Sequence, residues 1–446
     1  MTVTTSDDPP PGTPTTSEGS AQQLSLRQAI EQANQNGGET CILFDRAMLP
    51  VTIKPLVPLP ALRSPGIVID GFAKDENDCR NNRGASESPQ VSILGASTDT
   101  SLGEKHENGI LIRSNRCEIR GLAITGFKKA GVAIAPVCRF DNVGANVIEH
   151  NALVNNAKAG VLVLDPGEED QPAVSHNINN RISANEEMGS ATPIDLGGDG
   201  PTPNDTCDAD EGPNTFLNFP GRLSVTRSGD TVTIDGAISP DAATCPGCSQ
   251  DFSGTTVEIF AITQLVVPMD PSIPVGLAPA QNPPPAIQGI SFLRAAVPSP
   301  TGSFRLEGLP LSISGGYTAT FTDAAGNTSE LSVPCSGFPL EIIQSPISGK
   351  LMFGPFNPAA RTKEFRGLSQ QVRVQNTGCS TLRLNPPRLE RVVTSGQVND
   401  ISDPFFVITS KFDSQIRIEP GGTFSFLVAF TPSIPAVVTS DQERAR

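Results

Sequence analysis

The sequence predicts an all-β protein: a right-handed parallel β-helix with an N-terminal capping helix, followed by two Ig-like β-sandwich domains. Two observations lead to this prediction. The 446 residues include 41 glycines and 41 prolines, which favours many tight turns over long helices. Short β-branched runs also recur at a regular interval in the first half of the chain, as in stacked repeats. A chain of this length has room for about three domains.

The chain begins with a polar segment rich in Thr, Ser, Pro and Asp. It contains no hydrophobic stretch, so residues 1–23 are predicted to be a disordered leader and neither a signal peptide nor a strand.

A short helix is the first ordered element that we expect. Ser25 and Gln28 have the spacing of a capping box, and Gly37 follows the apolar pattern. The apolar residues recur at helical spacing, at Leu26, Ala29, Ile30 and Ala33. This helix has one apolar face and is expected to cap the open end of the repeats that follow it.

The next part of the chain consists of short strand-like runs and an internal repeat. The runs CILF, VTI, GIVID and VSIL are separated by turn residues. Four similar phrases, spaced by 22, 29 and 29 residues, begin at Gly109, Gly131, Gly160 and Gly189. The 29-residue interval also relates Ile124 to Leu153 and Ile182, Asn151 to Asn180, and Asn156 to Asn185. A regular period of short β runs without amphipathic helices indicates a parallel β-helix with structural Asn rows.

These residues also carry a family resemblance. LSLRQAIEQANQN, the coils after it, and IDLGGDGPTPNDTCDADEGPNTFLNFP resemble the CSLREAI-type bacterial extracellular β-helix proteins over roughly Leu24–Pro220. The chain departs from that motif at Leu24, where the family has Cys, and at Gln28, where it has Glu. The resemblance implies a β-helix over residues 24–220 and a secreted or cell-surface location. It implies no known reaction.

The pattern changes after Pro220. Residues 221–335 alternate apolar and polar side chains between turns, as in an antiparallel sandwich, and resemble a bacterial Ig-like module. The Pro-rich segment Pro268–Ala286 is expected to be an exposed loop. Residues 336–446 resemble an abnormal-spindle/hydin-like Ig fold, and this domain is expected to be incomplete because a final strand is hard to find before Arg446.

Charge and cysteine content limit the possible partners. The 32 basic and 47 acidic residues give a net charge of −15, which repels nucleic acids and anionic lipids. No apolar run is long enough for a membrane helix, so membrane insertion is not expected. The nine cysteines are scattered. Cys245 and Cys248 have the spacing of a redox or zinc motif, but a local disulfide or two inert thiols is the favoured interpretation.

The enzyme hypothesis rests on the fact that parallel β-helices also host polysaccharide lyases and glycoside hydrolases. The NTD, paired DD, GHG and RIK motifs of polygalacturonase-like enzymes do not occur in the coil sequences. The acids Glu168, Glu169 and Asp170 are expected to be solvated. A chain without Trp and with one Tyr offers few flat rings for sugar stacking. We therefore expect a non-catalytic extracellular or cell-surface scaffold or adhesion protein, with a secreted polysaccharide-binding or polysaccharide-degrading protein as the alternative.

Two lysines are a candidate ligand-binding pair. Lys129 and Lys158 are 29 residues apart and are expected to stack, where they could attract an acidic extracellular glycan. Glu187 is expected to take the next place in this column and to neutralise part of the charge. A solvated turn is the favoured interpretation, and a surface protein is the other partner considered.

An acidic loop gives the sharpest site hypothesis. Its glycines allow close backbone approach, and its carboxylate and amide oxygens are ligands that calcium prefers. The candidate ligands are Asp195, Asp199, Asn204, Asp205, Asp208, Asp210 and Asn214. The alternative is a connection rich in Asx turns, in which these side chains bond their own backbone.

Overall fold

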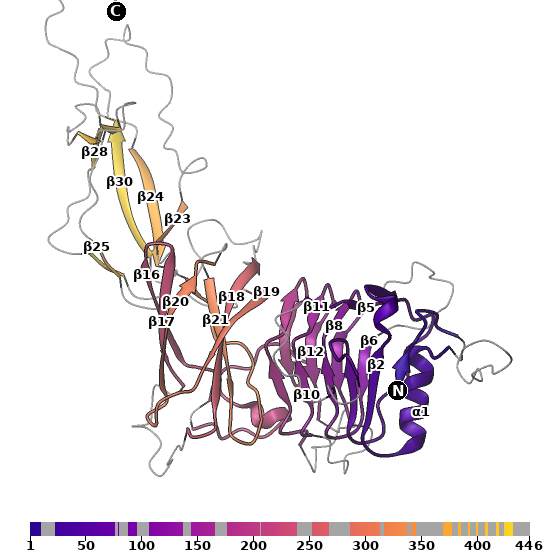
Figure 1. Cartoon of the computed structure of the whole chain (residues 1–446). Helices are drawn as coiled ribbons and strands as arrows, with labels where there is room; N and C mark the ends of the chain where they lie inside the picture. Colours follow the sequence, from indigo (N-terminus) through magenta and orange to yellow (C-terminus); the bar gives the residue numbers. More distant parts are fainter. Residues whose placement is uncertain are drawn as a thin grey trace, which may run out of the picture. The chain divides into compact units, whose positions relative to one another are not determined.

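A computed structural model describes most of the chain up to Ser336 and eight strands after it. The protein is all-β, as predicted: its described residues form mostly β-strands, with one α-helix and two short 3-10 turns. It divides into two compact units, Met1–Gly337 and Phe338–Arg446 (Figure 1). The described residues are 1–9, 23–75, 79, 88–95, 107–136, 144–165, 176–205, 207–238, 252–266, 286–312, 316–336, 340–344, 369–376, 382–384, 391–392, 398–399, 406–408, 416–418 and 423–430.

Among the described residues, 40–196 form three sheets of parallel strands, which we call the coil stack. The first contains β2 (Thr40–Phe44), β4 (Ile67–Asp70), β7 (Glu118–Arg120), β10 (Val147–Glu149) and β13 (Arg181–Ser183). The second contains β3 (Val51–Ile53), β5 (Val91–Leu94), β8 (Leu122–Thr125), β11 (Ala152–Val154) and β14 (Glu186–Met188). The third contains β6 (Asn108–Ile112), β9 (Ala130–Ile134), β12 (Ala159–Val163) and β15 (Thr192–Leu196). From β7 onward, each turn of the chain adds one strand to each sheet. We call each such turn a coil.

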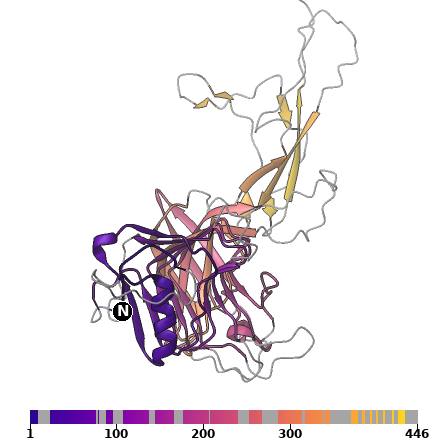
Figure 2. The same cartoon turned by 90° about the vertical axis from the view of Figure 1, so that its right-hand side faces the viewer.

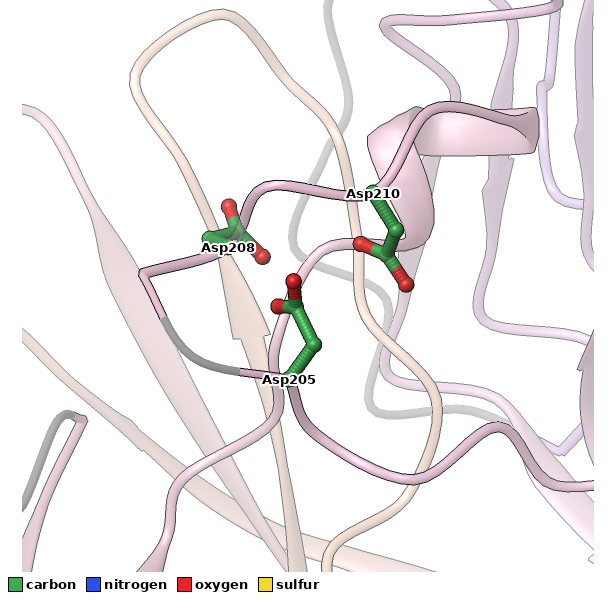
Figure 3. A group of neighbouring side chains, drawn as sticks. All are labelled: Asp205, Asp208 and Asp210. Carbon is green, nitrogen blue, oxygen red and sulfur yellow. The ribbon is translucent and has the colours of Figure 1, made fainter.

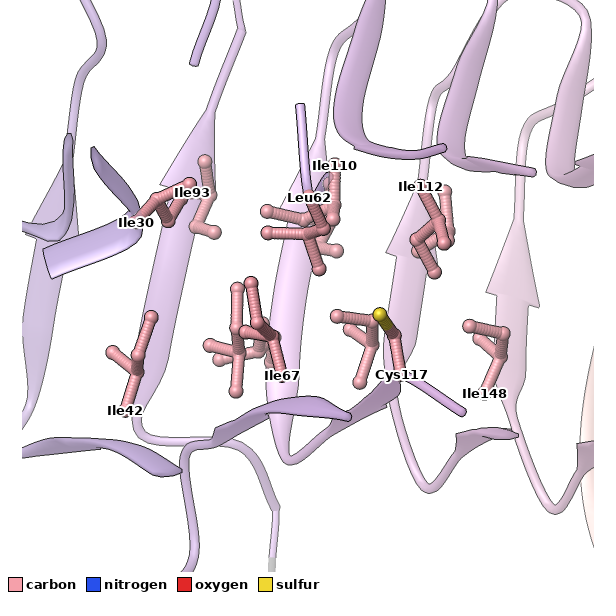
Figure 4. Packing of buried hydrophobic residues seen from close by; sticks show 14 of the residues in the cluster. Ile30, Ile42, Leu62, Ile67, Ile93, Ile110, Ile112, Cys117 and Ile148 are labelled. Atoms are coloured by element: carbon pink, nitrogen blue, oxygen red, sulfur yellow. The ribbon is translucent and has the colours of Figure 1, made fainter. Parts of the chain in front are cut away.

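Isoleucines stack between successive coils. In the first sheet a single row of directly paired residues runs through Ile42, Ile69, Ile119, Ile148 and Ile182. All five are buried in one continuous core, part of which is shown in Figure 4. Burying one such side chain contributes about 1.5–3 kcal/mol. Each coil gains this only because the next coil covers it.

Helix α1 (Leu26–Asn36) closes the N-terminal end of the coil stack, and Figure 2 shows it in front of the coils. The predicted capping box is confirmed: the Ser25 side chain accepts from the Gln28 N–H, and the Gln28 side chain accepts from the Ser25 N–H. The helix ends at Gly37, whose φ is 62°. Leu26 and Ile30 belong to the same buried cluster as Ile42.

Residues 1–9 are ordered, in contrast to the expected leader. Strand β1 (Thr2–Val3) pairs in parallel with β2, and Val3 is fully buried. Asp8 is buried against α1, where both of its oxygens accept bonds from Arg27, at 2.6 and 2.8 Å. The prediction of a disordered leader is therefore wrong for residues 1–9. A two-residue strand and one ion pair produce no periodic pattern from which the sequence could reveal them. Residues 10–22 lie outside the described residues.

Buried asparagines link neighbouring coils. The Asn146 side-chain oxygen accepts from the Cys117 N–H at 2.9 Å, that of Asn180 accepts from the Asn146 N–H at 3.3 Å, and that of Asn214 accepts from the Asn180 N–H at 3.0 Å. Steps of 29, 34 and 34 residues separate these partners. The structural role predicted for Asn is confirmed. The predicted pairing of Asn151 with Asn180 is wrong, because Asn151 bonds Asn185.

The same shift changes the predicted columns. Ile182 pairs with Ile148, and Leu153 is opposite Glu187. In the third sheet, Thr192 of β15 pairs with Ala159 of β12. The predicted alignment of the phrase at Gly189 with the phrase at Gly160 is therefore wrong. The cause is segment length: 17 residues (164–180) separate β12 from β13, whereas 12 (135–146) separate β9 from β10. A constant 29-residue interval therefore fails in the last coil.

Residues 222–336 form what we call the antiparallel region. Its strands are β16 (Arg222–Ser228), β17 (Thr231–Ala237), β18 (Thr256–Val266), β19 (Ala286–Ala296), β20 (Ser303–Pro310), β21 (Gly316–Thr322) and β22 (Cys335–Ser336). One sheet has the order β16-β17-β20, and the other continues the second coil sheet through β14-β19-β18-β21-β22. The sequence did not predict β19, which begins at Ala286, the last residue of the expected loop. Residues 268–285 of that loop lie outside the described residues.

Side chains of the antiparallel region bond the last coil. They accept hydrogen bonds from backbone N–H groups that would otherwise lie unpaired at the end of the stack. The donor and acceptor pairs are Asn179 N with Asn327 Oδ1 (2.6 Å), Ile182 N with Thr328 Oγ1 (3.0 Å), Ala184 N with Glu258 Oε2 (2.8 Å) and Leu196 N with Glu330 Oε1 (2.8 Å). The expected boundary at residue 220 therefore lies inside one compact unit.

The second unit contains short antiparallel strands. One sheet has β23 (Leu340–Gln344), β24 (Ser369–Asn376), β30 (Thr423–Phe430) and β28 (Phe406–Ile408). Two further pairs are β25 (Leu382–Leu384) with β29 (Ile416–Ile418), and β26 (Arg391–Val392) with β27 (Val398–Asn399). A small core gathers Val372, Val374, Ile418 and Val428.

Two short 3-10 turns and the cysteines complete the described fold. The turns are η1 (Arg46–Met48) and η3 (Pro213–Phe216). Cys41 and Cys79 form a disulfide with each other. Cys207 and Cys335 each take part in a disulfide too. Cys138, Cys245, Cys248 and Cys379 lie outside the described residues. Within the described part of the chain, no helix combines the length and apolar character that crossing a bilayer requires.

Candidate functional site

Three of the seven predicted calcium ligands come together. Asp205, Asp208 and Asp210 lie in the connection between β15 and β16, and one oxygen from each lies within 4.8 Å of the others (Figure 3). All three side chains are partly buried. Carboxylates at this separation can share one divalent cation.

The loop holds two of these carboxylates by its own hydrogen bonds. Asp205 Oδ2 accepts from the Ala209 N–H at 2.9 Å, and Asp208 Oδ1 accepts from the Asn218 N–H at 2.7 Å. Asn218 also accepts from the Asp205 N–H. This is the Asx-rich connection that we considered as the alternative to a metal site. Asp210 differs, because its buried Oδ1 has no hydrogen-bond partner among the described residues.

Crowding and burial change the ionisation of this cluster. Burial raises the pKa of Asp208 to about 6, and the neighbouring charges of Asp205, Asp210 and Asp323 act in the same direction. The pKa of Asp210 is also raised, first by burial and then by Asp205. Asp323 belongs to the turn after β21, so the cluster faces the antiparallel region.

The other four predicted ligands are used elsewhere in the fold. The buried Asp195 accepts from the Gly198 N–H at 2.9 Å. Burial raises the pKa of Glu330, and the charge of Asp199 acts in the same direction. Asn204 forms two hydrogen bonds with the Phe219 backbone. Asn214 is buried in the Asn row of the coil stack. The acidic loop thus contains some polar side chains that hold the fold together and others that are exposed. Their spacing in the sequence does not show which are which.

The two candidate lysines do stack. The Lys158 N–H donates to the Lys129 carbonyl at 2.8 Å, so the residues are neighbours in successive coils. Lys129 Nζ lies 2.9 Å from Glu107 Oε2, and Lys158 Nζ donates to the Gly198 carbonyl. The prediction that Glu187 follows them was wrong: it is 4% exposed and lies opposite Leu153.

A row of buried charges was missed by the sequence analysis. On the outer face of the first coil sheet, Arg120 Nη2 lies 2.6 Å from Asp70 Oδ2, and its Nη1 lies 3.7 Å from Glu149 Oε1. Arg181 bonds the other oxygen of Glu149. Each charge is the sequence neighbour of an inward isoleucine, so the alternation of faces was visible in the sequence, but the pairing of the charges depends on strand register. These charges neutralise one another across coils.

A histidine and two acids form another cluster. His176 Nδ1 lies 2.5 Å from Asp165 Oδ2, and its Nε2 lies 3.6 Å from the exposed Glu211 Oε2. Asp165 also accepts from the Asn177 N–H at 2.8 Å. The contacts orient the ring at the end of β12. Glu168, Glu169 and Asp170, the acids considered for catalysis, lie outside the described residues.

No family model matches the chain, and no curated protein shows significant sequence similarity to it.

Proposed function

We propose that the coil stack is a right-handed parallel β-helix, that Ig-like β-sandwiches follow it, and that the chain is a non-catalytic extracellular or cell-surface scaffold of the CSLREAI type. The carrying observation is that both ends of the coil stack are covered, by α1 and by the antiparallel region. When both ends are covered, strands of another chain cannot add to the stack, which suits a rigid scaffold. Secretion is supported by the disulfide between Cys41 and Cys79.

Screening for polysaccharide depolymerisation tests this proposal. Pectins, alginates and glycosaminoglycans are incubated with the full chain, and the products are measured by chromatography. No depolymerisation is expected. Robust cleavage of any of them would replace the scaffold by the enzyme alternative. Binding on a glycan array that disappears in the Lys129→Ala, Lys158→Ala double variant would instead favour a polysaccharide-binding protein.

We further propose that calcium binds to Asp205, Asp208 and Asp210 and stiffens the connection between the coil stack and the antiparallel region. The specific support is the convergence of three carboxylates beside Asp323, with an unpartnered oxygen on Asp210. Calcium takes 6–8 oxygens, so loop carbonyls and water would complete its shell. It would relieve the mutual repulsion of these acids.

Isothermal titration calorimetry with and without chelator tests the calcium proposal. Heat of binding and a higher Tm are expected at millimolar calcium. Both should vanish in the Asp208→Ala, Asp210→Ala double variant. The matched control is Asp235→Ala, an exposed acid paired with Arg305 outside the loop, which should still bind. A wild-type chain without binding heat would leave only the Asx-turn connection.

A further inference from the structure

A small pocket lies where the last coil meets the antiparallel region. Its lining comes from both sides: Leu153, Val161, Ile182 and Ile194 from the coils, and Phe260 and Ile290 from β18 and β19. Glu187 on β14 also lines it. Glu187 takes the place that Leu153 and Ile124 have in the preceding coils. An ionisable side chain therefore occupies a core position.

The carboxyl group of Glu187 is buried, and Ser190 compensates only part of the cost of its burial. Neither of its oxygens has a hydrogen-bond partner of good geometry among the described residues, and the pocket has room for about one water molecule, too little to hydrate a carboxylate. Gly160 makes space for the side chain, because a Cβ there would lie 2.8 Å from Glu187 Cγ. Leaving an ionised carboxylate in such a place is costly, whereas a neutral acid is tolerated.

The charged groups on the surrounding strands are engaged elsewhere. On the coil side, Arg181 of β13 bonds Glu149, and Asp195 of β15 accepts from Gly198. The other groups are Glu186 of β14, which accepts from the Phe292 N–H, Glu258 of β18, which accepts from Ser183 and Ala184, and Arg294 of β19, which donates to the Glu307 carbonyl. None of the pocket-lining residues named for β11, β12, β18 and β19 is charged. No described cation therefore neutralises Glu187.

We propose that Glu187 is a proton-dependent lock between the coil stack and the antiparallel region. With its proton, Glu187 fits the apolar pocket and β14 stays paired with β19. Without its proton, the buried charge favours opening of this junction, which admits water to the carboxylate. This proposal does not depend on the scaffold function.

The direction of the pH effect follows from burial. Burial raises the pKa of Glu187 from 4.5 to about 8, and Ser190 offsets only part of this. The folded chain therefore keeps a proton that the unfolded chain loses. The stabilisation is complete below about pH 4.5 and is lost as the pH rises to about 8. Between these limits, Glu187 changes the folding equilibrium by about tenfold per pH unit.

Thermal unfolding of the full chain from pH 5 to pH 9 tests the lock, with Glu187→Gln compared to wild type. The wild-type Tm should fall as the pH rises. In Glu187→Gln, the folding equilibrium should no longer show the roughly tenfold change per pH unit that Glu187 contributes. The control Glu307→Gln changes an exposed acid and should keep the wild-type profile. Parallel profiles for wild type and Glu187→Gln would overturn the proposal.

A second variant and a local measurement protect the test against a folding defect. Glu187→Leu restores the apolar side chain of the preceding coils and should show the same weak pH dependence even if the buried Gln destabilises the chain. Hydrogen exchange at fixed pH 8.5 should be faster in wild type than in Glu187→Leu for the Gly189 amide, which donates to Gln288 across the junction. Equal exchange rates at this amide would show that ionisation of Glu187 does not open the junction.

Discussion

The two ends of the coil stack are closed by different chemistry. At the N-terminal end, α1 buries Leu26 and Ile30 against the first coil and adds the Arg27–Asp8 ion pair. At the C-terminal end, polar side chains of the antiparallel region accept hydrogen bonds from coil backbone. The first closure uses residues that are close in sequence. The second uses partners 74–148 residues apart. One end of a stack can therefore be covered by a neighbouring helix that adds apolar contact, and the other by side chains of a distant segment that accept its backbone hydrogen bonds.

Disrupting the apolar end should have the largest effect. Ile30→Asp places an unpaired charge in the core and should cost about 4–5 kcal/mol or more of unfolding free energy. The measurement is chemical denaturation followed by circular dichroism. Ile30→Val removes one methyl group and should cost only about 0.5–1.5 kcal/mol. Wild-type stability in Ile30→Asp would show that α1 is not packed on the coils.

The buried ion pair at the same end should come next. Asp8→Ala leaves the Arg27 guanidinium without its carboxylate, which should cost about 3–5 kcal/mol. Adding Arg27→Met removes the stranded charge and should restore part of this stability. The same denaturation experiment compares both variants with wild type. No recovery in the double variant would mean that Asp8 acts mainly through its bond to the Leu56 N–H.

The polar end should respond more mildly to one change. Thr328→Val keeps the side-chain shape but removes the acceptor for the Ile182 N–H, which should cost about 1–3 kcal/mol. Hydrogen exchange should show faster exchange at Ile182, while amides of α1 stay protected. Thr301→Val, on the exposed turn before β20, is the matched control. Unchanged exchange at Ile182 would argue against closure by hydrogen bonding.

The smallest effect is expected on the coil sides, away from both ends. Lys129→Ala removes a half-exposed ion pair with Glu107, and such pairs contribute about 0.2–1 kcal/mol. Its Tm should stay close to that of wild type. A loss as large as that of Thr328→Val would give Lys129 a structural role that its exposure does not indicate.

The sequence predicted the closure by α1 but not the closure by the antiparallel region, because only the residues of α1 lie close together in the sequence. Ser25, Gln28 and the apolar residues of α1 fall within one short segment, so their spacing specifies a capped helix. By contrast, Glu258, Thr328 and Glu330 have no local pattern that identifies their partners in the last coil. Asp8 shows the same limit, since its partner Arg27 is 19 residues away.

Asn register could not be predicted for a different reason. In the coils that contain β10 and β13, buried Asn residues recur every five residues, at Asn146, Asn151 and Asn156 and again at Asn180 and Asn185. The segment before β13 is longer by the same five residues. A shift by one Asn therefore gives an equally good match in sequence, and only strand pairing distinguishes the two registers. The acidic trio was predicted within a larger set, because spacing does not reveal which acids the turns use.

That added length has a consequence for how the molecule can vary. Five extra residues enter between β12 and β13, yet Asn146 and Asn180 still bond and Ile148 still pairs with Ile182. The pairing between these two coils is therefore unchanged by the longer connection. The number of residues that join β12 to β13 can therefore change by five while the strands on either side keep their partners, so the register of the stack depends on strand pairing and not on a constant repeat length.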